Sequence, residues 1–233
     1  MSGPAANDGW RMPGLFPLLI ACWAVPPPSG AWAQSAEPLG DPAAGRWTAQ
    51  EFACGACHDP LAKDAPPNVP SIDGQKKAYL LRQMTAFRET RPATPGPYKS
   101  IERRHPKMDT WLKPLSETQI VNLAEYFASL PCVPRRTFAE ADVPRPALLQ
   151  RCQFCHGDRG VNPYTGYPNV GGQNKAYLIE QLKAFRASAN HGNVEIGKIK
   201  DERFHRTMEP SAYDLTDRDI EDIADYYSKQ SCQ

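Results

Sequence analysis

CGACH at residues 54–58 and CQFCH at residues 152–156 are two copies of one motif, Cys-X-X-Cys-His. Two thiols at this spacing can form thioethers with both vinyl groups of one haem, and the adjacent histidine then reaches the iron. Cysteine and histidine account for only 7 and 5 of the 233 residues, so two chance copies in one chain are very improbable. The sequence therefore predicts two covalently attached haem c groups. Their attachment residues are Cys54, Cys57, Cys152 and Cys155, and their histidine ligands are His58 and His156.

Two other uses of closely spaced cysteines compete with haem attachment. A thioredoxin-type redox pair needs a strand and a helix around it, and no strand pattern surrounds either motif. A zinc site made from four cysteines would leave His58 and His156 without a role. Haem attachment explains every residue of both motifs, and we favour it.

The likeness of the two halves extends far beyond the motifs. A shift of 98 residues, which places Cys54 on Cys152, also aligns Pro70, Gly74, Gln75, 77–80, Gln83 and 86–88 with Pro168, Gly172, Gln173, 175–178, Gln181 and 184–186. After two extra residues in the second half, a shift of 100 aligns His105, Met108, Leu115, Ile120, Ala124, Tyr126 and Cys132 with His205, Met208, Leu215, Ile220, Ala224, Tyr226 and Cys232. The chain is a tandem duplication.

Two small domains are expected from this duplication, at residues 41–133 and 146–233. The 24 prolines of the chain also oppose a single uninterrupted core. Residues 134–145 are bracketed by prolines that oppose a continuous helix, and we interpret them as the linker.

Each copy carries three helical patterns. The first leads into the motif, and the second has apolar residues at three- and four-residue spacing through residues 79–87 and 177–185. Ser116 and Gln119 form a capping-box signature for the third helix, and Thr216 caps its counterpart. No strand alternation is found, so the predicted fold class is all-α.

The first 33 residues have the pattern of a cleavable signal peptide. Arg11 precedes an apolar run at 15–25, and Ala31-Trp32-Ala33 provides a cleavage site after Ala33. The run is shorter than the roughly 20 residues that a membrane-spanning helix needs. An alternative is a lipobox at 19–22, which would place a lipid anchor on Cys22. We expect an exported, periplasmic protein.

The charge of the chain does not point to a strongly charged partner. The formal net charge is only +1 at pH 7, so no strong field favours nucleic acid or an anionic membrane. Nucleic-acid binding is therefore not expected.

Methionine is the expected distal ligand of the iron. It is a soft ligand that raises the reduction potential of a histidine-ligated haem. Met1 and Met12 lie in the leader, and Met84 lies on the inward face of a predicted helix, where it is read as core. Met108 and Met208 remain, each in a predicted loop before the last helix of its copy, and they are our candidate distal ligands.

Three histidines lie outside the motifs. His105 and His205 repeat in register three residues before the candidate methionines, so bis-histidine ligation is an alternative. Otherwise they are surface residues or contacts of the haem propionates. His191 has no counterpart in the first copy and is expected to lie in solvent.

Other repeated residues are candidates for supporting the haem. Pro70 and Pro168 each stand twelve residues past a motif histidine, and a carbonyl there could accept the hydrogen bond of its Nδ1. A plain turn proline is the alternative. Haem propionates need hydrogen-bond donors, and four repeated residues could provide them. Packing or solvent-facing roles are the alternatives for these residues. The four are Tyr79, Arg88, Tyr177 and Arg186.

Cys132 and Cys232 hold equivalent positions just past the last helix of each copy. An exported chain matures in an oxidising compartment, where each cysteine needs an assigned role. If the domains pack about a pseudo-twofold axis, points near the axis approach each other, and one disulfide could join the two halves. Free or intermolecular thiols are the alternative.

The complete pattern resembles the dihaem cytochrome c4 family over nearly the whole mature chain. The pattern is Cys-X-X-Cys-His, Pro, Gly-Gln-X-X-Ala-Tyr-Leu, Gln-X-X-X-Phe-Arg and Met-X₆-Leu before a closing helix, twice over. The resemblance implies two tandem class I cytochrome c domains related by a pseudo-twofold axis. It also implies a periplasmic carrier, at most peripherally associated with the membrane. Such a carrier passes electrons from a periplasmic or membrane donor, such as a bc1-type complex, to a terminal oxidase.

Three features depart from the family pattern. His58 is followed by Asp59, where the second motif continues with Gly157, so the first haem loop is expected to differ. Residues 91–104 are rich in proline and charge and have no clear counterpart. The Cys132 and Cys232 pair is not expected of every member.

Two other functions compete with a carrier of this kind. Similar dihaem chains serve as electron-transfer subunits of periplasmic dehydrogenases, for example those that oxidise sulfur compounds. A haem enzyme would need an open distal position, which methionine at both irons closes. We expect an electron carrier without catalytic residues.

Overall fold

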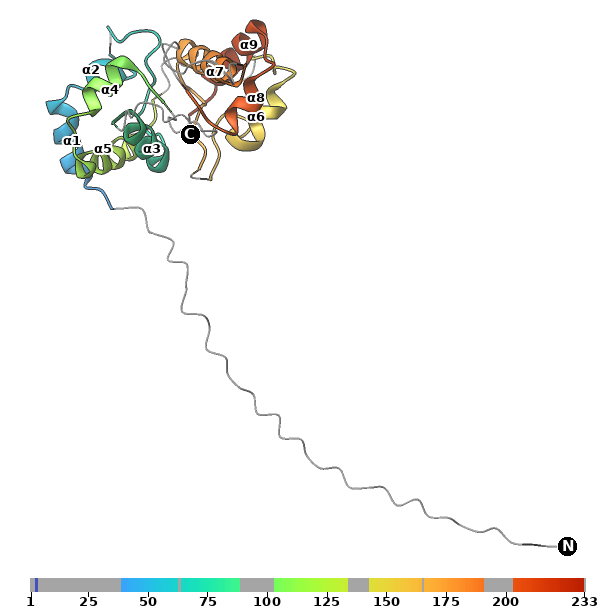
Figure 1. Ribbon diagram of the computed structural model, residues 1–233, viewed down its shortest axis with the longest axis horizontal. Coiled ribbons are helices and arrows are strands. Elements are labelled where there is room, and N and C mark those ends of the chain that lie inside the picture. The colour runs from blue at the N-terminus through green and yellow to red at the C-terminus, as the bar shows by residue number, and fades with distance from the viewer. Residues whose placement is uncertain are drawn as a thin grey trace. The chain divides into compact units, whose positions relative to one another are not determined.

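The computed structural model describes residue 3 and residues 39–62, 64–88, 103–133, 143–164, 166–190 and 203–232 (Figure 1). Apart from residue 3, the predicted signal peptide lies outside the described residues. So do residues 134–142 of the predicted linker, His191, and most of the proline-rich stretch at 91–104.

The described residues form helices in an order that repeats. The first half, blue to green in Figure 1, contains α1 (Pro42–Glu51), α2 (Gly55–His58), α3 (Lys77–Arg88), α4 (Pro106–Leu112) and α5 (Glu117–Ser129). The second half, yellow to red, contains α6 (Leu149–His156), α7 (Lys175–Asn190), α8 (Met208–Ala212) and α9 (Asp217–Ser228). Within the described part of the chain, strand-like pairing is limited to one isolated bridge between Arg103 and Arg203. The all-α prediction is confirmed.

Side-chain caps fix where the last helix of each half begins. The Ser116 side chain accepts a hydrogen bond from the Gln119 N–H, and the Gln119 side chain accepts one from the Ser116 N–H. Thr216 and Asp219 make the same reciprocal pair at the start of α9. Each box satisfies N–H groups that have no partner inside the helix. Both predicted caps are confirmed.

Each half has its own cluster of buried apolar residues. Ile120 and Leu123 of α5 lie at the centre of the first cluster, and Ile220 and Ile223 of α9 take the equivalent places in the second. Met84 belongs to the first cluster and is 9% exposed, as its assignment to the core requires. The last helix provides a continuous apolar face in each half, so that α1 and α3 pack against α5, and α7 packs against α9.

The segments that carry the candidate methionines differ from their prediction. Met108 and Met208 were expected in loops, but Met108 lies within α4 and Met208 is the first residue of α8. Pro106 is the first residue of α4, where its missing N–H costs no helical hydrogen bond. Helices of seven and five residues are too short to give a readable apolar period, and for this reason the loop prediction was wrong.

The glycines of the two Gly-Gln turns adopt a conformation that other residues avoid. Gly74 has φ +66° and Gly172 has φ +67°. A Cβ at Gly74 would lie 2.7 Å from the Cβ of Cys132, and one at Gly172 would lie 2.9 Å from the Cβ of Cys232. Backbone freedom and close approach both require glycine here. The turns thus bring residues 75 and 173 close to the cysteine pair.

Candidate functional site

The motif cysteines lie on short helices that present both thiols of a pair one turn apart. Cys54 precedes α2 and Cys57 lies within it, while Cys152 and Cys155 both lie in α6. None of the four is in a disulfide. Residues three apart on a helix share a face, which is the arrangement that two thioethers to one group need.

The protonation of these thiols argues against a redox pair. Burial raises the pKa of Cys54, and burial raises the pKa of Cys152 to about 11. A reactive thiol of a dithiol oxidoreductase has a lowered pKa, so that the thiolate is available. Haem attachment therefore suits these cysteines better than disulfide exchange.

The motif histidines are oriented in the same way in both halves. The Nδ1 of His58 lies 3.0 Å from the Pro70 carbonyl oxygen, and the Nδ1 of His156 lies 3.0 Å from that of Pro168. A carbonyl can only accept, so Nδ1 carries the proton, and in the neutral ring the lone pair is on Nε2. This is the tautomer that an iron ligand needs, and the predicted role of the two prolines is confirmed.

Burial also keeps the second histidine neutral. His156 is 8% exposed, and burial lowers its pKa, while the Pro168 carbonyl opposes that shift. Two thiols and a neutral imidazole with a fixed Nδ1 form a donor set that fits a covalently bound haem.

The candidate methionines pack against the same apolar cluster as the first motif cysteine in each half. Met108 and Cys54 both pack against the first apolar cluster, and Met208 and Cys152 both pack against the second. All four are partly buried. The structure therefore brings each methionine to the same cluster as the first cysteine of its own motif.

The competing histidines lie at the start of the same short helices. His105 is the N-cap residue of α4, and its N–H donates to the Asp109 carboxylate at 3.2 Å. The Nδ1 of His205 accepts a hydrogen bond from the Thr207 N–H at 3.3 Å. An accepting Nδ1 places the proton of a neutral imidazole on Nε2, which then cannot bind a metal.

The chain leaves the two motifs by different routes, as the sequence predicted. Asp59 is extended, with φ −63° and ψ 120°, and its carboxylate accepts from the Leu61 N–H at 2.8 Å. Gly157 has φ +80°, and a Cβ there would lie 2.2 Å from the Val161 oxygen. Asp59 thus could not follow the path that Gly157 takes.

Two arginines that sequence analysis missed occupy equivalent places between the halves. Arg103 donates to Gln83 at 2.8 Å and to the Tyr177 hydroxyl at 2.9 Å. Arg203 makes the mirror pair, to Gln181 at 2.5 Å and to the Tyr79 hydroxyl at 3.0 Å. Their guanidinium carbons lie 4.7 Å from the ring centres of Phe87 and Phe185. The 100-residue shift that aligns His105 with His205 also aligns these arginines, and that signal could have found them.

The two arginines act on the ionisation of half-buried Tyr79 and buried Tyr177. Burial opposes ionisation of Tyr79, but the guanidinium groups of Arg203 and Arg103 outweigh it and lower its pKa to about 8. Burial raises the pKa of Tyr177. The two phenols thus share one pair of cations and differ in acidity.

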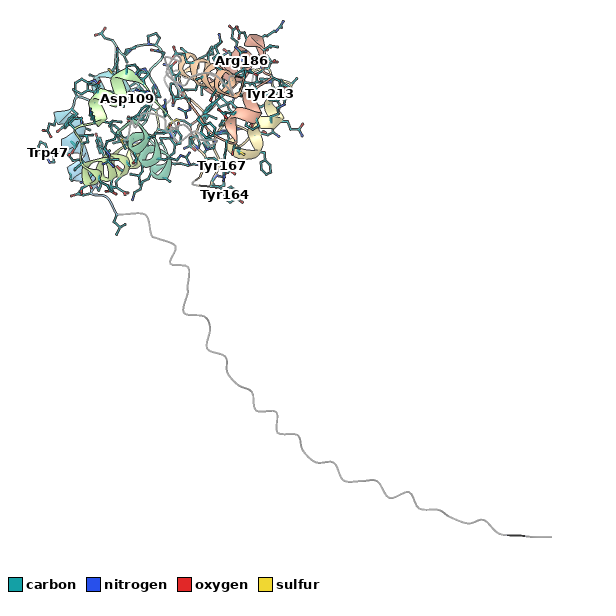
Figure 2. All side chains as sticks on the ribbon, in the orientation of Figure 1. Trp47, Asp109, Tyr164, Tyr167, Arg186 and Tyr213 are labelled. Atoms are coloured by element: carbon teal, nitrogen blue, oxygen red, sulfur yellow. A yellow bond between two sulfur atoms is a disulfide. The ribbon has the colours of Figure 1, made fainter. Side chains whose placement is uncertain are left out.

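Arg186, one of the predicted propionate donors, is committed elsewhere. Labelled in Figure 2, it donates to the Leu215 carbonyl at 2.7 Å and pairs with Asp217 at 2.5 Å. These contacts tie α7 to the start of α9. This is a packing role, one of the two interpretations that the sequence left open.

Cys132 and Cys232 form a disulfide, with a Cα–Cα distance of 6.0 Å. The predicted bond between the halves is therefore present.

Within the described ranges, no helix combines the length and the apolar character needed to cross a membrane.

Comparisons with known proteins identify the family of the chain. The family model for cytochrome c matches residues 43–131 and 146–230. Cytochrome c4 of Stutzerimonas stutzeri is 31% identical over 192 residues, which cover 74% of this chain and 82% of the relative. The thiosulfate dehydrogenase electron acceptor of Thiomonas intermedia (strain K12) is 26% identical, covering 77% of this chain and 74% of the relative.

The fold agrees as well. The crystal structure of reduced recombinant cytochrome c4 from Pseudomonas stutzeri superposes with a TM-score of 0.58 and 29% sequence identity, covering 83% of this chain and all of that one. The two family matches coincide with the two halves of the duplication, and each contains one Cys-X-X-Cys-His motif. The chain therefore belongs to the cytochrome c family, as a cytochrome c4-type electron carrier with two tandem cytochrome c domains and two covalently bound haem c groups.

Proposed function

We propose that this chain is a periplasmic carrier in which each domain holds one haem between a histidine and a methionine. His58 and Met108 would bind the iron in the first domain, and His156 and Met208 would bind it in the second. The observation that carries the histidine assignment is the Nδ1 contact of 3.0 Å to a proline carbonyl, which occurs in both halves. Haem supplies the one-electron chemistry. The protein orients the imidazole, covers the iron and excludes other ligands.

Methionine is preferred to histidine on the distal side for two reasons. Met108 and Met208 pack on the same apolar clusters as Cys54 and Cys152. His205 uses its Nδ1 as an acceptor, which favours the tautomer that cannot bind iron through Nε2. Because the repeat places His105 in register with His205, we assign methionine in both domains.

The spectroscopic test of this carrier uses the intact exported protein. Mass spectrometry should give the chain without its first 33 residues plus two haems, and potentiometric titration should resolve two one-electron steps. Carbon monoxide should not bind the reduced protein at neutral pH, because methionine closes both irons. Rapid carbon monoxide binding would contradict the ligand assignment and favour a haem enzyme.

The proposed redox partners are those that a periplasmic protein can reach. We propose that the protein accepts electrons from a periplasmic or membrane donor, such as a bc1-type complex, and passes them to a terminal oxidase. The N-terminal pattern of Arg11, the apolar run and Ala31-Trp32-Ala33 supports export. Fractionation that recovers the holoprotein with the periplasmic contents would support this proposal. Recovery only with detergent-extracted membranes would favour a lipid anchor at Cys22.

A second candidate is the acceptor subunit of a periplasmic dehydrogenase. It is favoured by the similarity to the thiosulfate dehydrogenase electron acceptor over 77% of this chain. Affinity purification from the native cell discriminates the two. A stoichiometric dehydrogenase that reduces the bound cytochrome with thiosulfate would establish the subunit role, and purification of the cytochrome alone, oxidised rapidly by membranes, would support the carrier.

A further inference from the structure

Gln75 and Gln173 each reach from their own half into the other. The Oε1 of Gln173 accepts from the Ser71 N–H at 2.8 Å, and its Nε2 donates to the Ser71 carbonyl at 2.8 Å. The Oε1 of Gln75 accepts from the Asn169 N–H at 2.8 Å, and its Nε2 donates to the Asn169 carbonyl at 2.8 Å. The two glutamine side chains are 7% and 8% exposed. Each one therefore clamps one residue of the opposite half.

The clamped residues directly follow the prolines that hold the motif histidines. The Ser71 N–H and the Pro70 carbonyl belong to a single peptide group, and that carbonyl contacts the Nδ1 of His58. A continuous hydrogen-bonded path thus runs from Gln173 of the second domain through one peptide group to His58 of the first. The path from Gln75 through the peptide group of Pro168 and Asn169 to His156 is its counterpart.

Each glutamine oxygen also accepts a hydrogen bond from the backbone of its own half. The Gln173 Oε1 also accepts from the Asn174 N–H at 2.8 Å, and the Gln75 Oε1 accepts from the Lys76 N–H at 3.0 Å. Two backbone N–H donors therefore fix each oxygen. Because the clamps are buried, water competes poorly for the N–H groups of Ser71 and Asn169.

The hydrogen-bonded path from the glutamine to the histidine should lower the reduction potential of the iron. When a peptide N–H donates a hydrogen bond, its carbonyl becomes a stronger acceptor, because hydrogen bonds in a chain polarise one another. A stronger acceptor at Nδ1 makes the imidazole a more basic metal ligand. A more basic ligand stabilises the oxidised iron over the reduced iron, which lowers the reduction potential.

We propose that Gln75 and Gln173 are positioning residues that act across the pseudo-twofold axis, each lowering the reduction potential of the haem in the other domain through its motif histidine. This inference rests on the proposed function, because it takes His58 and His156 as iron ligands. Its consequence is that the potential of each haem depends on the docking of the opposite domain.

The test replaces one glutamine at a time in the holoprotein. In Gln173→Leu the Ser71 N–H loses its acceptor, so we expect the ring N–H resonance of His58 in the reduced protein to move upfield. One of the two reduction potentials should rise, and the His156 resonance should stay in place. In Gln75→Leu the His156 resonance and the other potential should respond. The ring N–H signals are assigned by Overhauser contacts to Pro70 and Pro168.

Two further variants keep the test decisive. Gln173→Glu retains an acceptor oxygen in either protonation state, so the potential that rises in Gln173→Leu should not rise. Gln230 is another buried glutamine of the second domain, 6% exposed, and its side chain bonds the Tyr226 carbonyl instead. Gln230→Leu should move neither histidine resonance.

Two results would overturn the inference in different ways. If the variants keep both haems and both axial histidine N–H signals, yet neither signal moves or only the one in the mutated domain moves, the cross-domain role is wrong and the proposed function stands. If the wild-type protein shows no ring N–H signal of a haem-bound histidine, the ligand assignment fails, and the inference fails with it.

Discussion

Arg103 and Arg203 form an antiparallel β-bridge in which each residue occupies the place of the other in the repeat. Arg103 is 9% exposed and bonds Gln83 and the Tyr177 hydroxyl. Replacing it with methionine keeps much of the volume but removes one hydrogen bond from each of these two polar partners. We expect Arg103→Met to lower the free energy of unfolding by about 1–3 kcal/mol, the usual cost of lost buried hydrogen bonds.

The measurement is guanidinium unfolding of the oxidised holoprotein, followed by far-ultraviolet circular dichroism. Arg206 is exposed, and Arg206→Met is the matched control, expected to stay within about 0.5 kcal/mol of wild type. Equal stability of the two variants would show that the bridge arginines contribute nothing to the domain interface.

The disulfide between Cys132 and Cys232 closes a loop with a sequence separation of 100 residues. Closing a long loop restricts the unfolded chain, and removal of such a bond typically costs about 2–4 kcal/mol. We expect the Cys132→Ser, Cys232→Ser double variant to lose that much stability, with both haems still attached. Denatured, unreduced wild-type holoprotein should offer no alkylatable thiol once the leader is removed. Two alkylatable thiols would contradict the bond.

Asp73 should make the stability depend on pH. Burial, reinforced by the nearby Asp59 carboxylate, raises the pKa of Asp73 from 3.8 to about 6. Between these values the folded protein binds more protons than the unfolded chain, so the free energy of unfolding falls as the pH rises from about 4 to 6. This is the sign for a carboxyl group whose folded pKa is raised.

Asp73→Asn should abolish this fall in the free energy of unfolding between about pH 4 and 6. We expect the variant to be more stable than wild type by about 1 kcal/mol at pH 7, after allowance for solvent screening of a half-buried group, and equally stable near pH 4. Denaturation curves at several pH values between these limits measure the difference. A constant difference between the two proteins at every pH would show that Asp73 does not titrate as described.

The features that sequence could predict are those set by short-range chemistry or by the repeat. Three of these features are local: the spacing within Cys-X-X-Cys-His, the twelve-residue step from His58 to Pro70, and the Ser116 capping box. The structure contains the contact between His58 and Pro70 and the hydrogen bonds of the capping box. The bond between Cys132 and Cys232 was predictable because both the parity of the cysteines and the register of the repeat pointed to it.

The hydrogen bonds between the two halves were missed. The repeat aligns Gln75 with Gln173, but no local pattern tells that each side chain clamps a residue about a hundred positions away. Arg103 stands at the end of a proline-rich stretch, which hid its alignment with Arg203.

The helices α4 and α8 were missed for another reason, because they are too short for an apolar period to be read.

The central claim is that each domain holds a haem with one histidine and one methionine ligand. Its most direct test is the weak long-wavelength charge-transfer band that oxidised haem shows only with a methionine ligand, recorded at neutral pH in Met108→Ala, Met208→Ala and the double variant. Each single variant should lose about half of the wild-type band and the double variant all of it, with both haems still attached. A band that is absent from wild type, or that survives in the double variant, would contradict the assignment.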